Sequence, residues 1–242
     1  QIPSCGDEVQ RAAVMEREKR LQGIIFLGGR FDYTPEDLTM LNVPFVCCSY
    51  SNQYGTLRVG EYSAVSIADE ETARQAVDHL YDHGHRRIAA LICREDDQSI
   101  SQLRYQGYRK ALESHGIPVD EELVMCAGSF DIRDAYEAVR EKLRQGAEFT
   151  ALFAIADSMA IGAMRALRDA GRRIPEDCSV IAIDGLELSA YIEPPLTTLC
   201  QPMEEMGRRS AQILLGMLRG HGVHCCEVLP TQLREGGSVQ SL

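Results

Sequence analysis

Three aspartates stand where short apolar stretches of this 242-residue chain end: Asp69, Asp157 and Asp184. Short apolar stretches of this kind are typical of buried parallel strands. In an open α/β sheet the ligand crevice lies beyond the carboxyl ends of such strands. The three carboxylates are therefore candidates for one polar site.

The same three carboxylates could act as acid and base, so an enzyme is one hypothesis for this chain. The sequence offers no Ser–His–Asp or G-x-S-x-G arrangement to supply a nucleophile. Gly28 and Gly29 belong to no G-x-G-x-x-G or phosphate-binding loop. We therefore expect a binding protein rather than an enzyme, and no cofactor.

Histidines and cysteines are the other residues with metal chemistry. His79, His83 and His85 form an H-x3-H-x-H pattern whose first pair shares one helix face. A metal site there is one interpretation, and structural roles around a helix end are the simpler one. The nine cysteines are odd in number and contain no C-x-x-C pair, which indicates free thiols and a reducing compartment, most simply the cytoplasm. We expect no metal site.

Composition narrows the class of protein further. Hydrophobic residues make up 45% and charged residues 25% of the chain, as in an ordinary globular protein, which excludes global disorder. The formal net charge of −11 disfavours binding to nucleic acid through bulk charge. No apolar run approaches the roughly 20 residues that cross a bilayer, so no membrane association is expected.

Strand-like and helix-like segments alternate along the chain. Strands are expected at residues 23–29, 43–48, 88–93, 151–155 and 180–184. Amphipathic helices are expected at residues 7–21, 69–84, 104–115, 131–145, 158–170 and 202–218. This alternation predicts an α/β fold with doubly wound parallel sheets.

Five motifs occur in an order similar to that of LacI-type bacterial transcriptional regulators. The first joins V-S-I-A-D at residues 65–69 to H-L at 79–80 and G-H-R-R-I-A at 84–89. The second is R-Y-Q-G-Y at 104–108, followed by A-L and G-I, and the third is F-A-I-A-D-S-M-A-I-G-A at 153–163. The last two are I-P-E-D-C-S-V-I-A-I-D at 174–184 and P-L-T-T-L-C-Q-P at 195–202. The resemblance covers about residues 20–235.

The resemblance implies two lobes of the periplasmic-binding-protein type with a ligand cleft between them. One lobe would comprise residues 1–83 and 203–229, and the other residues 84–202 and 230–242. Members of this family begin with a helix-turn-helix head and a first β–α unit. In this chain residues 1–4 align with the second strand, so the DNA-binding head is expected to be absent.

The resemblance also assigns roles to charged residues. Arg104 aligns with an arginine of the cleft, the alternative being a solvated arginine at a helix start. Asp184 aligns with a strand-end aspartate that accepts from ligand, the alternative being an Asx turn before Gly185. Asp69 aligns with another cleft aspartate and could also cap a helix. Asp157 is expected mainly as a helix N-cap, because the asparagine usual before it is Ala156 here.

Three further residues complete the expected ligand site. Phe130 falls where the family often has an aromatic that stacks on ligand, the alternative being core packing. Met203 takes a position often filled by an aromatic, and Tyr191 is a further candidate for the cleft.

By resemblance, the chain is the effector-binding domain of a regulator that senses a sugar or sugar derivative. Lobe closure would change the affinity of a homodimer for operator DNA, contacted only through the missing head. The alternative is a solute-binding protein of a membrane transporter, which shares the fold.

Overall fold

The computed structural model describes residues 8–30, 32–58, 60–94 and 98–242, and it divides into two compact units. The first unit comprises residues 1–67 and 202–230, and the second residues 68–201 and 231–242. The sequence-based boundary after residue 83 placed residues 68–83 in the first lobe. These residues belong to the second unit, because their helix packs on the next helix of that unit.

The first unit contains a parallel four-stranded sheet. Its strands follow the order β1 (Ile24–Leu27), β2 (Phe45–Cys48), β3 (Ala64–Ile67) and β9 (Cys226–Leu229). Its helices are α1 (Glu8–Lys19), α2 (Pro35–Leu38) and α7 (Met203–Leu218), and α7 packs on β1, β2 and β3. The strand expected at residues 1–4 lies outside the described residues.

The second unit contains a six-stranded sheet in the order β10-β8-β7-β6-β4-β5. These strands are β4 (Ile88–Ile92), β5 (Val124–Cys126), β6 (Ala151–Ala154), β7 (Ser179–Asp184), β8 (Thr197–Cys200) and β10 (Gln232–Arg234). All neighbours are parallel except β10 and β8, so the predicted α/β fold with parallel sheets is confirmed, with one antiparallel strand at this edge. The chain returns to this unit after β9 and can pair there as an antiparallel edge strand.

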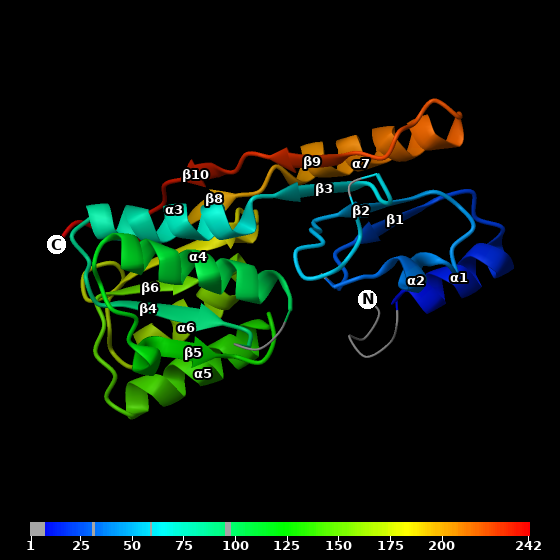
Figure 1. The fold of residues 1–242 in the computed structure, drawn as a ribbon. Coiled ribbons are helices and arrows are strands. Elements are labelled where there is room, and N and C mark those ends of the chain that lie inside the picture. The colour runs from blue at the N-terminus through cyan, green and yellow to red at the C-terminus, as the bar shows by residue number, and fades with distance from the viewer. Residues whose placement is uncertain (1–7, 31, 59, 95–97) are drawn as a thin grey trace. The chain divides into compact units, whose positions relative to one another are not determined.

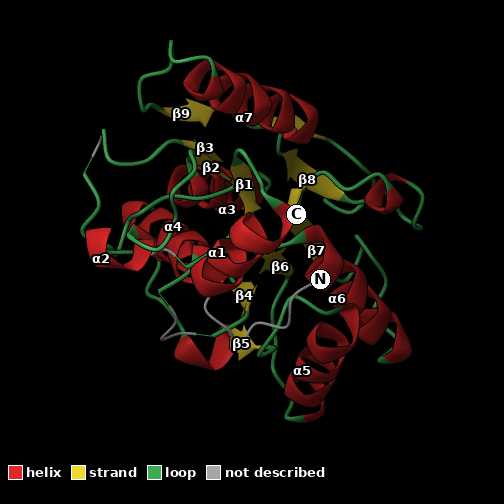
Figure 2. Cartoon of the chain, turned by 90° about the vertical axis from the view of Figure 1, so that its right-hand side faces the viewer, coloured by secondary structure: helices red, strands yellow, loops and turns green. Residues whose placement is uncertain are grey.

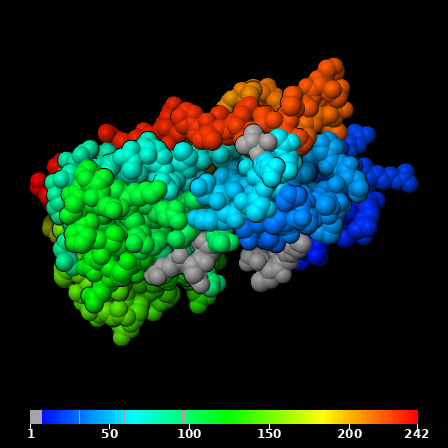
Figure 3. Space-filling view, viewed as in Figure 1, coloured from blue at the N-terminus to red at the C-terminus, as the bar shows by residue number. Residues whose placement is uncertain are grey.

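Two helix pairs cover this sheet: α3 (Asp69–Asp82) with α4 (Ile100–Ser114), and α5 (Ile132–Arg144) with α6 (Asp157–Asp169). Figure 1 shows the two pairs on opposite sides of the sheet, as a doubly wound fold requires. Figure 2 shows α5 and α6 side by side, and in Figure 3 the surfaces of α3 and α4 adjoin. Short 3-10 turns lie at Glu121–Leu123 and Leu188–Ala190.

Two glycines permit the close approach of the paired helices. A Cβ on Gly107 would lie 2.2 Å from the carbonyl oxygen of Glu70, and a Cβ on Gly162 equally close to that of Ile132. Real Cβ atoms never come so near to a backbone oxygen. The α3–α4 and α5–α6 pairs therefore depend on glycine at these positions.

The start of α4 differs from the sequence-based expectation. The helix begins at Ile100, four residues before the expected start at Arg104, because the Ser99 side chain caps it by accepting from the N–H of Ser101. Arg104 therefore lies in the second turn and faces the sheet rather than solvent.

Among the described residues, no helix is both long and apolar enough to cross a membrane.

Candidate functional site

A buried arginine joins three elements of the second unit. Arg104 is 1% exposed. Its Nε donates to Asp69 Oδ1 at 2.9 Å, and its Nη1 donates to the Ile155 carbonyl at 2.5 Å and to Asp184 Oδ1 at 3.2 Å. The alternative of a solvated arginine at a helix start is therefore wrong. We call Arg104, Asp69 and Asp184 the arginine cluster.

The fold brings this cluster together from strand ends. Asp184 is the last residue of β7, Ile155 follows β6, and Asp69 begins α3 two residues after the last residue of β3. The carboxyl ends of parallel strands meet at one edge of a sheet, so β6 and β7 deliver their groups to the same place. Arg104 reaches that edge from α4.

One nitrogen of the guanidinium is left over. Arg104 Nη2 is buried, and it donates to none of the described residues. A buried N–H group without a partner costs about 1–3 kcal/mol. Such a group is suited to a ligand that supplies the missing acceptor.

Asp184 adopts a backbone conformation that side chains rarely take, with φ at 139°. Its Oδ1 also accepts from Gln201 Nε2 at 2.7 Å, and the Gln201 N–H donates to the Asp184 carbonyl at 3.0 Å. Backbone strain of this kind is common at ligand sites and is held in place by the surrounding structure. The alternative of an Asx turn before Gly185 is wrong, because the N–H of Leu186 donates to Asp157 instead.

Gln201 is the site residue that the sequence interpretation missed. A signal for it was present, since the fifth motif includes this glutamine just before Pro202. Its neighbour Cys200 pairs with Asp184 between β8 and β7, which explains why Gln201 reaches the carboxylate.

Charges within the cluster depend on one another. Burial raises the pKa of Asp69, Arg104 opposes that rise, and Asp184 adds to it. Burial would lower the pKa of Arg104, but Asp69 and Asp184 together raise it above its ordinary value, so the guanidinium stays charged. Asp69 does not cap α3, since Ala68 is the cap residue and no side chain caps this end.

Asp157 serves a structural network next to the cluster. Its Oδ2 accepts from the N–H of Leu186 and from Ser189 Oγ, both at 2.7 Å, and its Oδ1 accepts from Thr198 Oγ1 at 2.6 Å. It begins α6 as the first helical residue, and no side chain caps that helix, so the N-cap prediction is wrong. Both carboxylate oxygens are occupied by bonds to the segment after β7 and to β8.

The three apolar candidates are all exposed. Phe130, which precedes α5, is 40% exposed, so core packing is wrong for it. Tyr191, after the turn Leu188–Ala190, is 78% exposed, and Met203 at the start of α7 in the first unit is 46% exposed. None of the three belongs to the hydrogen-bonded cluster of Arg104.

The histidines have structural partners. His85 is buried, its Nδ1 lies 3.0 Å from Thr150 Oγ1, and its Nε2 lies 3.0 Å from Ser179 Oγ and 3.1 Å from the Gln240 carbonyl. The ring of His83 bonds the carbonyl of His79. Within the described ranges no three His, Cys, Asp or Glu side chains form a metal-binding group.

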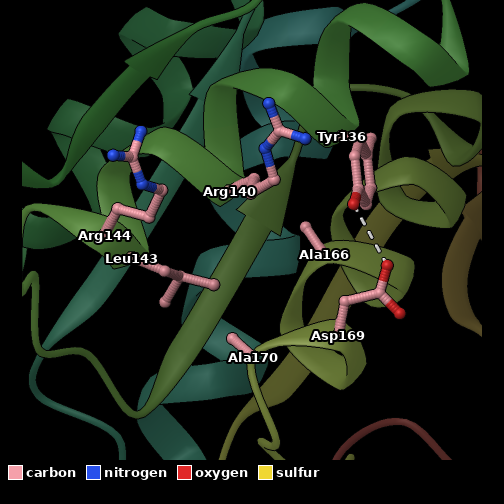
Figure 4. A pocket seen from close by; sticks show the side chains of 7 residues that line it. All are labelled: Tyr136, Arg140, Leu143, Arg144, Ala166, Asp169 and Ala170. Carbon is pink, nitrogen blue, oxygen red and sulfur yellow. Dashed lines mark hydrogen bonds between the residues drawn. The ribbon is translucent and has the colours of Figure 1, made fainter.

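A groove of about 360 Å³ lies between α5 and α6 on the second unit. Figure 4 shows Tyr136 of α5 joined to Asp169 of α6 by a hydrogen bond of 3.1 Å, with Arg140 beside Tyr136 and Arg144 farther along α5. Its lining includes no residue of the arginine cluster.

Known proteins share the sequence and the fold of this chain. The family described as "Periplasmic binding protein-like domain" matches residues 77–239. The transcriptional regulator MalR of Clostridium butyricum is 35% identical over 92% of this chain and 66% of its own length. The regulator CelR of Thermobifida fusca is 35% identical over 96% of this chain and 68% of its own length. The solved complex of CelR with cellobiose is 34% identical, with a TM-score of 0.84 over 96% of this chain and 70% of that one. The chain thus spans about two thirds of the length of these relatives.

Proposed function

Because the chain belongs to the LacI-type family of transcriptional regulators and matches its periplasmic-binding-protein-like domain, we propose that it binds a sugar at the arginine cluster. The relatives are regulators rather than enzymes or transport proteins, so a sensing role is favoured over the solute-binding alternative. The cellobiose complex of CelR supports a sugar as the class of ligand.

The single observation that carries the site is the unpartnered Nη2 of Arg104. A sugar hydroxyl can accept from this nitrogen and donate to a neighbouring carboxylate. Among the described residues Asp184 Oδ2 accepts no hydrogen bond, whereas Oδ1 accepts two. One hydroxyl, or a vicinal pair, would satisfy both groups together.

The remaining expected site residues have weaker support. Phe130 and Tyr191 of the second unit are exposed and aromatic, so each could cover a sugar face. For Met203, which belongs to the first unit, the resemblance alone supports a role in binding. Asp157 would act by fixing the segment after β7 and not by direct contact with ligand, because its oxygens are occupied.

The proposal extends to the whole protein through its relatives. We propose that sugar binding favours one of two conformations and so changes the affinity for operator DNA, contacted by a helix-turn-helix head. A homodimer would match a pseudo-palindromic operator. Because its relatives are transcriptional regulators, we place the protein in the cytoplasm, where bacterial DNA lies. Light scattering of the purified chain would test the dimer, and the gene sequence upstream of Gln1 would test the head.

A thermal-shift screen with neutral sugars, including cellobiose, tests the sensing role. A sugar at 100 times its dissociation constant should raise the free energy of unfolding by about 2.7 kcal/mol. The shift should vanish in Arg104→Lys, which keeps the charge and loses the fork, and persist in Arg140→Lys in the α5–α6 groove. A screen in which no sugar stabilises the chain would count against the proposal.

A further inference from the structure

Negative groups outnumber positive ones around the arginine cluster. Asp69 and Asp184 both accept from Arg104, and Asp157 accepts from the N–H of Leu186, two residues after Asp184. The cations are Arg104 and Arg234, and Arg234 donates to Ser189 Oγ, which in turn donates to Asp157. The side chains of this region therefore carry three negative and two positive formal charges.

These carboxylates influence one another. The charge of Asp184 raises the pKa of Asp69 and the pKa of Asp157, in each case after the larger effect of burial. A further negative charge brought close to Asp184 would meet the same repulsion.

The positive charge of Arg104 is already paired with the carboxylates of Asp69 and Asp184. Its Nε and Nη1 are bonded to Asp69, Asp184 and the Ile155 carbonyl, and Nη2 alone is left. A carboxylate or phosphate is bound most strongly by two parallel N–H bonds from the fork, which this arginine no longer offers. The group nearest solvent is Asp184, whose side chain is 19% exposed while that of Arg104 is 2% exposed.

Helix ends offset this excess of negative side-chain charge, but at positions that aspartates of the site already occupy. The N-termini of α3 and α6, at Asp69 and Asp157, each contribute about half a positive charge. Both of these termini already have an aspartate of the cluster as their first residue. Their positive ends are therefore occupied before a ligand arrives.

From this arrangement we infer that the site selects uncharged polyhydroxy compounds and rejects anionic ones such as sugar phosphates and sugar acids. The inference rests on the proposed function and narrows its ligand class. A hydroxyl can accept from Arg104 Nη2 and donate to Asp184, whereas an anionic group can only accept and would face the Asp184 carboxylate.

Calorimetric titration of the whole chain with matched ligands tests this selectivity. The series is cellobiose, or the best neutral sugar of the screen, together with its aldonic acid, its terminal phosphate and its amino-sugar analogue, at low ionic strength. The acid and the phosphate should bind roughly tenfold more weakly than the neutral sugar, or worse. The amino sugar should bind about as well. Anionic members that bind as tightly as the neutral sugar would overturn the inference, whereas no binding by any member would overturn the proposed function.

Asp184→Asn isolates the charge responsible. It removes one negative charge with little change of shape, so the ratio of affinities for the neutral and the anionic ligand should fall by roughly tenfold. Glu113→Gln, on the exposed side of α4, removes the same charge elsewhere and should leave the ratio unchanged.

Added salt on the wild-type chain gives a second readout that needs no variant. It should strengthen binding of the anionic ligand and leave the neutral one unaffected, and the opposite salt dependence would contradict the inference.

Discussion

Arg104 donates from Nε to Asp69 at 2.9 Å, across 35 residues of sequence, while Nη2 of the same guanidinium is buried and donates to none of the described residues. The bond to Asp69 stabilises the fold, and the unpartnered Nη2 can donate to a ligand. Variants of Arg104 therefore separate a structural effect from a binding effect.

Arg104→Ala should lower the free energy of unfolding by about 3–5 kcal/mol, because it leaves the buried carboxylate of Asp69 and that of Asp184 without their cation. Arg104→Lys should cost less, since a charge remains. Urea denaturation of both variants measures the difference. Equal stability of Arg104→Ala and wild type would show that the carboxylates do not depend on this arginine.

Asp157→Ala should destabilise the chain by about 3 kcal/mol or more, because it leaves the Leu186 N–H, Ser189 Oγ and Thr198 Oγ1 without their acceptor. Asp157→Asn keeps one oxygen and should cost less. Denaturant midpoints give the comparison. If Asp157→Ala left stability unchanged and abolished sugar binding, Asp157 would be a ligand residue and not a structural one.

The sequence was sufficient for the elements that have a strong apolar pattern. The strands at Ile88–Ile92 and Ser179–Asp184 and the helix at Asp157–Asp169 lie within about a residue of their predicted ranges. β8, β9 and β10 were not predicted, because they are short, and β9 and β10 are partly exposed edge strands without a continuous apolar run.

The candidate site was predicted in its residue types but not in its bonding. Spacing placed Asp69, Asp157 and Asp184 at strand ends, yet it could not show which of them bond Arg104. That depends on the start of α4 at Ile100, set by the Ser99 cap, and on the bond from Leu186 to Asp157. Both are contacts of single atoms, and periodicity carries no information about them.

Gly107→Ala should destabilise the second unit by about 1–3 kcal/mol, because its Cβ would lie 2.2 Å from the Glu70 carbonyl and push α3 away from α4. Gly207→Ala is the matched control. It lies within α7, nothing lies within 4 Å of its Cβ position, and it should stabilise the chain by about 0.5–1 kcal/mol. Thermal unfolding measures both variants. Midpoints that shift in the same direction for Gly107→Ala and Gly207→Ala would contradict this explanation.

Stability should depend on pH through His85. Burial lowers the pKa of His85 below its ordinary value of 6.5, so below that pH the unfolded chain binds a proton that the folded chain resists. The contribution of neutral His85 is therefore present above pH 6.5 and is lost as the pH falls below it. The stability difference between wild type and His85→Gln should therefore shrink as the pH is lowered from 7.5 to 5.5.

His221→Gln, at an exposed position after α7, serves as the control for this pH dependence. Urea denaturation of both variants over the same pH range gives the comparison. If the stability difference between wild type and His85→Gln stayed constant, His85 would bind its proton equally well in the folded and the unfolded chain, which would contradict this prediction.

The most direct test of the central claim is calorimetric titration of a sugar that stabilises the wild-type chain into Arg104→Lys and Arg140→Lys. We predict that Arg104→Lys folds but binds the sugar at least about a hundredfold more weakly than the wild-type chain, because the unpartnered Nη2 donor and the fork of the guanidinium are lost. For Arg140→Lys we predict wild-type affinity. Undiminished binding by a folded Arg104→Lys would contradict the assignment of the sugar site to the arginine cluster.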